Sequence, residues 1–103
     1  MKFVVAFRPR GGGSSAEVEA DTKRGLAAFA AWKPAEGVTF HQFVARLDGG
    51  GYAVVEADDP ALVAEGPAKF GVWFDFEVVP VIDVGEIVPI AQEAIAFRDS
   101  LPS

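Results

Sequence analysis

The sequence predicts an α+β fold built on one antiparallel sheet, and three observations lead to this prediction. Strand-forming and helix-forming patterns alternate in the order strand, helix, strand, strand, helix, strand, helix. The two middle strands are joined by a glycine-rich turn, DGGG. The 103 residues, half of them hydrophobic, suffice for one modest core. We therefore expect a single domain over residues 1–103 with the split βαβ, or ferredoxin-like, pattern and an added C-terminal helix.

The first strand and helix are the clearest elements. Lys2–Arg8 is rich in Val and Phe and apolar at both alternating sets of positions, which predicts a strand covered on both faces. Ser14 followed by Glu17 is a capping-box pattern at the start of a helix. The helix should end near Trp32, because Pro34 disfavours helical geometry in the residue before it. The expected inward positions are Val18, Thr22, Leu26 (or Gly25) and Phe29.

The stretch Val38–Ala57 reads as two strands around the glycine turn. The turn does not fix the register, and a slip of one residue moves every side chain to the other face. Alternation alone places Phe40, Gln42, Val44 and Arg46 on one face and His41, Phe43, Ala45 and Leu47 on the other.

Four prolines limit the helices and strands expected in the second half of the chain. Asp59-Pro60 is a helix start, and Pro67 predicts a kink or two short helical pieces. In the strand candidate Val72–Ile82, Pro80 indicates an edge or a bulge. Pro89 is expected in the first turn of the last helix, whose apolar stripe is Ile87, Ile90, Ala94, Phe97 and Leu101.

The topology leaves one face of the sheet without a helix. Right-handed crossovers place the first two helices on the same face. A monomer rarely exposes a large apolar face to solvent, so we expect a homodimer in which the two sheets pack face to face. The alternative is a monomer in which the C-terminal helix folds over the open face.

Composition narrows the classes of function. The formal charge is −6, and no basic cluster is present, which argues against binding to nucleic acid or to anionic membranes. The chain has no cysteine, which excludes disulfides and thiolate chemistry. The apolar start is too short for a signal peptide, and no run approaches the ~20 apolar residues of a membrane span. We expect a cytoplasmic protein.

Three segments carry a family resemblance: KFVVAFRPR, WKPAEGVTFHQFVARLDGGGYAVVEADD and KFGVWFDFEVVPVID. Together they resemble an uncharacterised bacterial domain-of-unknown-function family (DUF3303-like). The resemblance implies membership of the dimeric α+β barrels, a superfamily that includes cofactor-independent monooxygenases, lactone isomerases and haem-handling enzymes. It implies no activity for the family itself.

Six residues are candidates for a polar site. His41 is the natural general base, and Arg46 could hold a ligand carboxylate or form a cross-strand pair with Glu56. The alternative is that His41 is bonded for structural reasons alone. On the last strand, Trp73, Asp75 and Glu77 are expected on one face, where they either contact a ligand or protect a sheet edge.

Other chemistry has less support in the sequence. Asp75 and Glu77 could bind a divalent metal together with His41, but one histidine without ligand spacing is a weak signal for a metal site. We expect neither a metal nor a cofactor. The loop RPRGGGSS either binds an anion at a helix start or is a mobile surface loop.

These features allow three functions. The first is a domain that binds a small, partly apolar ligand in a pocket of the homodimer, lined by Phe side chains and Trp73. The second is a cofactor-independent isomerase or monooxygenase in which His41 abstracts a proton and Arg46 holds negative charge. The third is an interaction or assembly module.

Overall fold

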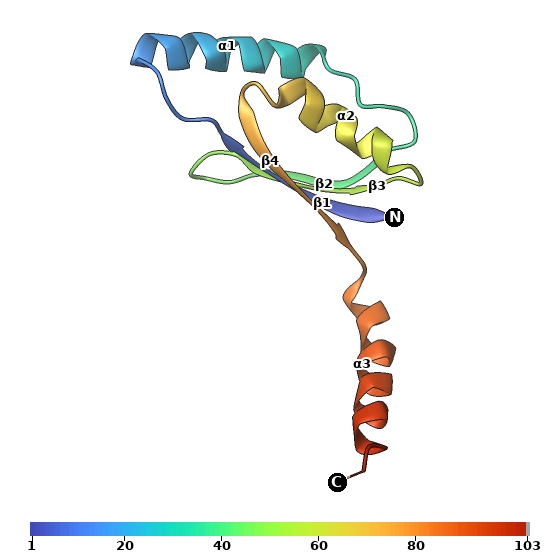
Figure 1. The fold of residues 1–103 in the computed structure, drawn as a ribbon. Helices are drawn as coiled ribbons and strands as arrows, with labels where there is room; N and C mark the ends of the chain where they lie inside the picture. Colours follow the sequence, from blue (N-terminus) through green and yellow to red (C-terminus); the bar gives the residue numbers. More distant parts are fainter. Residues whose placement is uncertain (103) are drawn as a thin grey trace.

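The computed structural model describes residues 1–102 and confirms an α+β, ferredoxin-like fold (Figure 1). The four strands form one antiparallel sheet in the order β2-β3-β1-β4. Helices α1 and α2 lie on one side of this sheet, as the crossover rule predicts. The elements are β1 (Lys2–Pro9), α1 (Ser15–Ala31), β2 (Thr39–Ala45), β3 (Gly51–Glu56), α2 (Pro60–Phe70), β4 (Phe74–Val81) and α3 (Val84–Asp99).

The core lies between the central strands and α2. In β1, alternate residues face the helices, and among them Phe3 and Val5 are buried. They pair with Val55 and Ala53 of β3, which are also buried, and Val63 of α2 covers them. This side of the sheet is called the helix side below, and the other is called the open face.

Local sequence signals set the ends of α1 and α2. The Ser14 side chain accepts a hydrogen bond from the Glu17 backbone N–H, and the Glu17 carboxylate accepts one from the Ser14 backbone, so the capping box is confirmed. Trp32 is the C-cap of α1, and Asp59 caps α2 ahead of Pro60. Of the two outcomes expected at Pro67, a kink or two short helical pieces, the second is wrong, because α2 runs as a single helix from Pro60 to Phe70 with Pro67 inside it.

A bulge in β2 corrects the alternation predicted for the hairpin. Phe40 pairs with Val55 and Gln42 pairs with Val54, so His41 is an extra residue in β2. The bulge places both Phe40 and Phe43 on the helix side, whereas simple alternation separated them. With both rings on the helix side, Phe40 and Phe43 stack with centroids 5.5 Å apart, a contact that a regular register would not allow.

Strand β4 is an edge strand, which agrees with the position expected for Pro80. The face expected for Trp73 is wrong, because β4 begins only at Phe74 and Trp73 belongs to the preceding turn. Its ring packs over Gly25 of α1, on the helix side, while Asp75 and Glu77 lie on the open face.

Helix α3 stands away from the rest of the chain (Figure 1). It gives the molecule extents of 66 × 31 × 21 Å and a radius of gyration of 19.0 Å, against about 13 Å for a compact domain of this length. Pro89 is the sixth residue of this helix rather than part of its first turn, which corrects that prediction. The monomer in which the last helix covers its own sheet is also not the observed arrangement.

Candidate functional site

Helix α1 is held off the sheet, and an apolar cavity of about 680 Å³ fills the space between them. Gly25 is the only buried residue of α1, where the backbone approaches the Trp73 ring. The stripe predicted to face inward does face the sheet and borders the cavity, and its Phe29 ring contacts Phe43 of β2. Its members that line the cavity are Val18, Thr22, Gly25, Leu26 and Phe29.

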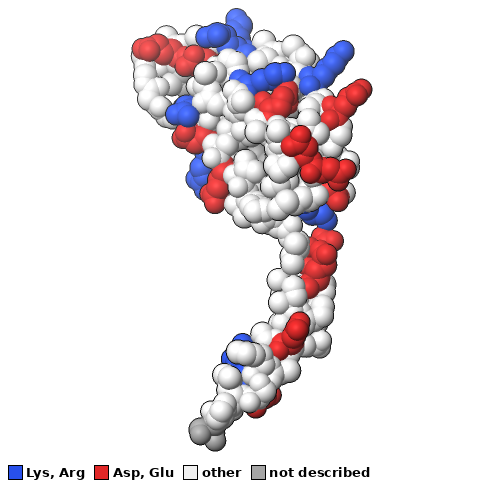
Figure 2. Space-filling view, turned by 45° about the vertical axis from the view of Figure 1, so that its right-hand side comes forward, with Lys and Arg blue, Asp and Glu red and all other residues white. Residues whose placement is uncertain are grey.

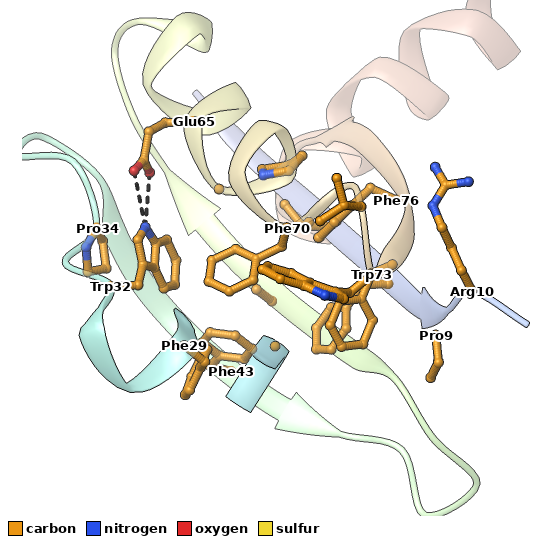
Figure 3. Close-up of a pocket in the computed structure, with 18 of the residues that line it drawn as sticks. Pro9, Arg10, Phe29, Trp32, Pro34, Phe43, Glu65, Phe70, Trp73 and Phe76 are labelled. Carbon is orange, nitrogen blue, oxygen red and sulfur yellow. Dashed lines mark hydrogen bonds between the residues drawn. The ribbon is translucent and has the colours of Figure 1, made fainter. Parts of the chain in front are cut away.

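Aromatic rings from both layers form the cavity wall (Figure 3). Phe43 of β2 meets Phe29 of α1 edge to face, with ring centroids 5.8 Å apart, and it meets Phe7 of β1 at 5.9 Å. At the other end, Phe70 lies 5.3 Å from Trp32 and 6.1 Å from Trp73. Edge-to-face packing stabilises rings beyond the burial of their area, so the wall is preorganised.

One polar cluster closes the end of the cavity near α2. The indole Nε1–H of Trp32 donates to both Glu65 carboxylate oxygens, at 3.1 and 3.3 Å, and Lys69 pairs with the same group at 2.7 Å. Burial acts to raise the pKa of Glu65, but hydrogen bonds from Lys69 and Trp32 outweigh it and lower the pKa below its usual value. The carboxylate is therefore ionised and already occupied, and it positions Trp32.

Arg10 lines the other end of the cavity, and Arg24 contacts the Trp73 ring of the cavity wall. The Arg10 Nε–H donates to the Gly71 carbonyl at 2.8 Å, and its Nη2 lies 3.2 Å from Asp75. The Arg24 guanidinium lies 5.8 Å from the centroid of the Trp73 ring, within the range of a cation–π contact. These contacts join the loop after β1, the turn before β4 and α1 around the cavity.

The other predicted site residues lie on the open face. His41 Nε2 is 2.7 Å from a Glu56 carboxylate oxygen, so the bulged residue is bonded to a carboxylate. The hydrogen bond from His41 lowers the pKa of Glu56. The cross-strand pair of Arg46 with Glu56 is not formed. Arg46 instead makes two hydrogen bonds to Asp48, at 2.7 and 2.8 Å, and a third to Tyr52.

The structure therefore separates the six candidates instead of bringing them together. His41 and Glu56 form one pair, Arg46 is held by Asp48, and Asp75 contacts Arg10. Trp73 alone lines the cavity. Across residues 1–102, no three His, Asp or Glu side chains gather in a geometry that would hold a metal ion.

Several cavity residues were missed as site candidates, although the sequence contained a signal for them. Phe7, Phe74 and Phe76 recur at alternate positions of strands, and Phe40 and Phe43 flank the bulge. Phe side chains were expected to line a pocket of the homodimer, but their positions were not named. No local pattern in the sequence shows that α1 leaves a cavity above these rings.

The fold and the cavity together define a ferredoxin-like α+β domain with an apolar, aromatic-lined hollow under its first helix. The chain belongs to the DUF3303 family, a domain of unknown function, whose family model matches residues 1–95. A search of curated proteins found no match to the sequence. Over the described residues, no helix combines the length and the apolar character needed to cross a membrane.

Proposed function

We propose that the chain binds a small, largely apolar ligand with a planar aromatic part in the cavity under α1. The observation that carries this proposal is the cavity itself: about 680 Å³, within the ~300–1,000 Å³ range of small-molecule sites. Without an occupant, the exposed apolar stripe of α1 would bury more surface by moving onto the sheet. A ligand between the two layers removes that apolar surface from water.

The lining favours recognition by shape and ring contacts. Within residues 1–102, every buried side-chain nitrogen or oxygen atom has a hydrogen-bond partner, so none is left to select a strongly polar ligand. Glu65 and Arg10 at the two ends are already bonded to protein groups. The ligand class that fits is an uncharged aromatic compound or one with a single polar group directed toward an end of the cavity.

The cavity belongs to one chain, on the helix side of the sheet. This differs from a pocket enclosed between the two sheets of a dimer, which was the expected location. Proton abstraction by His41 gains no support from the geometry, because Arg46 is occupied by Asp48 and Trp73 lies on the other side of the sheet.

Two adjacent residues allow a matched test. Phe43 and Val44 are 46% and 47% exposed, but Phe43 lines the cavity and Val44 lies on the open face. We expect the uncharged fluorescent probe N-phenyl-1-naphthylamine to bind the wild type, about tenfold more weakly to Phe43→Asp, and unchanged to Val44→Asp. Fluorescence titration measures the three affinities, and circular dichroism confirms that each variant is folded.

The proposal is wrong if the wild type does not bind the probe, or if both substitutions weaken binding equally. Equal weakening would mean that the probe reports general exposure of apolar surface and not the cavity. A further cavity variant, Leu26→Trp, fills the cavity from α1 without removing an aromatic ring. It should also lower the affinity for the probe while leaving the fold intact.

A further inference from the structure

Helix α3 exposes a continuous apolar stripe that nothing in its own chain covers. None of the sixteen residues of α3, all of them described, is buried. Along the stripe, Ile87, Ile90 and Phe97 are 47%, 56% and 64% exposed. By the helix periodicity Asp99 lies on the side opposite the stripe and Glu86 and Glu93 flank the stripe, and Figure 2 shows much of α3 without charge. An isolated helix of this length is marginally stable in water, so it needs a packing partner.

The open face of the sheet is a second apolar surface without cover. Its centre is formed by residues that pair across three strands: Val4 of β1 lies between Val54 of β3 and Val79 of β4. Val44 and Tyr52 extend this surface toward the hairpin, and both are exposed. Monomeric proteins rarely leave such a contiguous patch in water.

The chain is built so that its own α3 does not cover this face. Only Ile82 and Asp83 separate β4 from α3. Asp83 is fixed from two directions, since Lys2 Nζ contacts its carboxylate at 2.7 Å and the Glu86 carboxylate accepts from its backbone N–H at 3.0 Å. The hydrogen bond and charge of Lys2 also lower the pKa of Asp83. With its first turn fixed in this way, α3 leaves the sheet instead of folding back.

Figure 1 shows where a partner fits. Helices α1 and α2 lie on one side of the sheet, and α3 extends on the other side, which is the side of the open face. A second molecule that covers the open face therefore comes to lie beside α3. By two-fold symmetry, its own α3 extends toward the first molecule.

We propose that α3 is an exchange arm: a second copy of this chain covers the open face, and each copy packs its α3 against the other. The sizes agree with a stable dimer. Four strands about 4.8 Å apart and six to eight residues long give the sheet face about 450 Å². The arm of sixteen residues, about 24 Å long, adds a strip of a few hundred Å². Standard interfaces bury about 800 Å² per partner.

The charges on the open face permit a copy to approach despite the net charge of −6. Most of the charged groups on this face are already paired, so they present little net field to an identical surface. The pairs are Lys2 with Asp83, Arg46 with Asp48, and Arg10 with Asp75, and His41 forms a hydrogen bond with the Glu56 carboxylate. The acids of α1 lie on the other side of the sheet, and Asp99 lies on the side of α3 opposite its stripe.

Light scattering on the full chain and four variants tests the proposal. Ile90→Asp places a charge in the α3 stripe, and Gln92→Asp places the same charge on the polar side of that helix. Val44→Asp places one on the open face, and Phe43→Asp places one on the helix side. At about 100 µM, where micromolar dimers are largely formed, we expect twice the chain mass of 10.9 kDa for the wild type, Gln92→Asp and Phe43→Asp. Ile90→Asp and Val44→Asp should shift toward the chain mass.

Each outcome decides the question. A wild type at the chain mass overturns the proposal and assigns both apolar surfaces to another occupant. A dimer that survives Ile90→Asp overturns the role of the arm, even if Val44→Asp dissociates it. Equal loss with Gln92→Asp would show that added charge, and not the stripe, matters. Because α3 contributes nothing to the core of its own chain, the thermal melting of the ferredoxin-like body under monomeric conditions should be the same in Ile90→Asp and Gln92→Asp.

Discussion

The two faces of the sheet are made by alternate residues of the same strands, yet their side chains differ in burial and in their partners. On the helix side, Val55 and Ala53 are buried, and rings from five elements enclose a cavity. On the open face, the neighbouring residues Glu56, Val54 and Tyr52 are solvent-accessible, and the charged groups form local pairs. The helix side is covered by α1 and α2 but contains a cavity. The open face, by contrast, is covered by no described part of its own chain.

This difference indicates two separate roles for one sheet. Packing on the helix side is sufficient for the fold and leaves a space of ligand size. The open face contributes little to the stability of the single chain, so its apolar residues are free to serve an interface. Substitutions at adjacent residues of one strand should therefore have unequal effects.

The largest contrast is expected between Val55 and Val54. Val55 is 2% exposed and packs in the core, so Val55→Ala should lower the free energy of unfolding by about 2–3 kcal/mol, from lost burial and the space left behind. Val54→Ala removes the same atoms from the open face and should cost under about 1 kcal/mol in the monomer. Urea unfolding at low protein concentration measures both values. Equal losses would mean that the open face is covered within one chain.

A smaller contrast is expected between Glu65 and Glu77. Glu65→Ala leaves the Trp32 indole N–H without its acceptor beside the cavity and should lower the free energy of unfolding by about 1 kcal/mol. Glu77→Ala on the open face is the control, since Glu77 makes no ion pair in residues 1–102, and it should change stability by under about 0.5 kcal/mol. Trp fluorescence should shift to longer wavelength only in Glu65→Ala. A larger effect of the control would contradict the assignment of the polar cluster.

Local and periodic signals explain how much of the fold followed from the sequence. The capping box at Ser14, the Asp59-Pro60 start and the edge position of Pro80 depend on groups within a few residues of each other. The strand order followed from the βαββαβ order and the handedness of crossovers. Each of these is decided by short-range geometry or by topology.

The site was less accessible to sequence reasoning, because it depends on distances between layers. The bulge at His41 is fixed by the competition of Phe40 and Phe43 for the core, and a single strand pattern does not contain that competition. Trp73 was placed by strand alternation although it precedes the strand. The cavity exists because α1 stands off the sheet, packing on the Trp73 ring at Gly25 and meeting β2 through Phe29 and Phe43, and no local pattern encodes that separation.

The smallest effect concerns the pH dependence of the open face. The hydrogen bond from His41 lowers the pKa of Glu56 from its usual 4.5, so the native state holds the proton of this carboxyl less tightly than the unfolded chain does. The stabilisation is therefore present above pH 4.5 and is lost as the pH falls through the lowered native value. Glu56→Gln removes this contribution, so its melting temperature should fall less than that of the wild type between about pH 5 and pH 3.

Asp48 provides the comparison for this last effect, since Arg46 lowers its pKa through a hydrogen bond on the same face. Asp48→Asn should reduce the acid-induced fall in melting temperature at lower pH than Glu56→Gln does, because the usual pKa of Asp48 is 3.8. Both groups are solvent-exposed, so the two differences should be small and should shrink further in high salt. A Glu56→Gln variant that follows the wild-type curve throughout would show that the pair with His41 does not persist in solution. The open face would then lose one of its local charge pairs, and the charge balance expected for a facing copy would change with it.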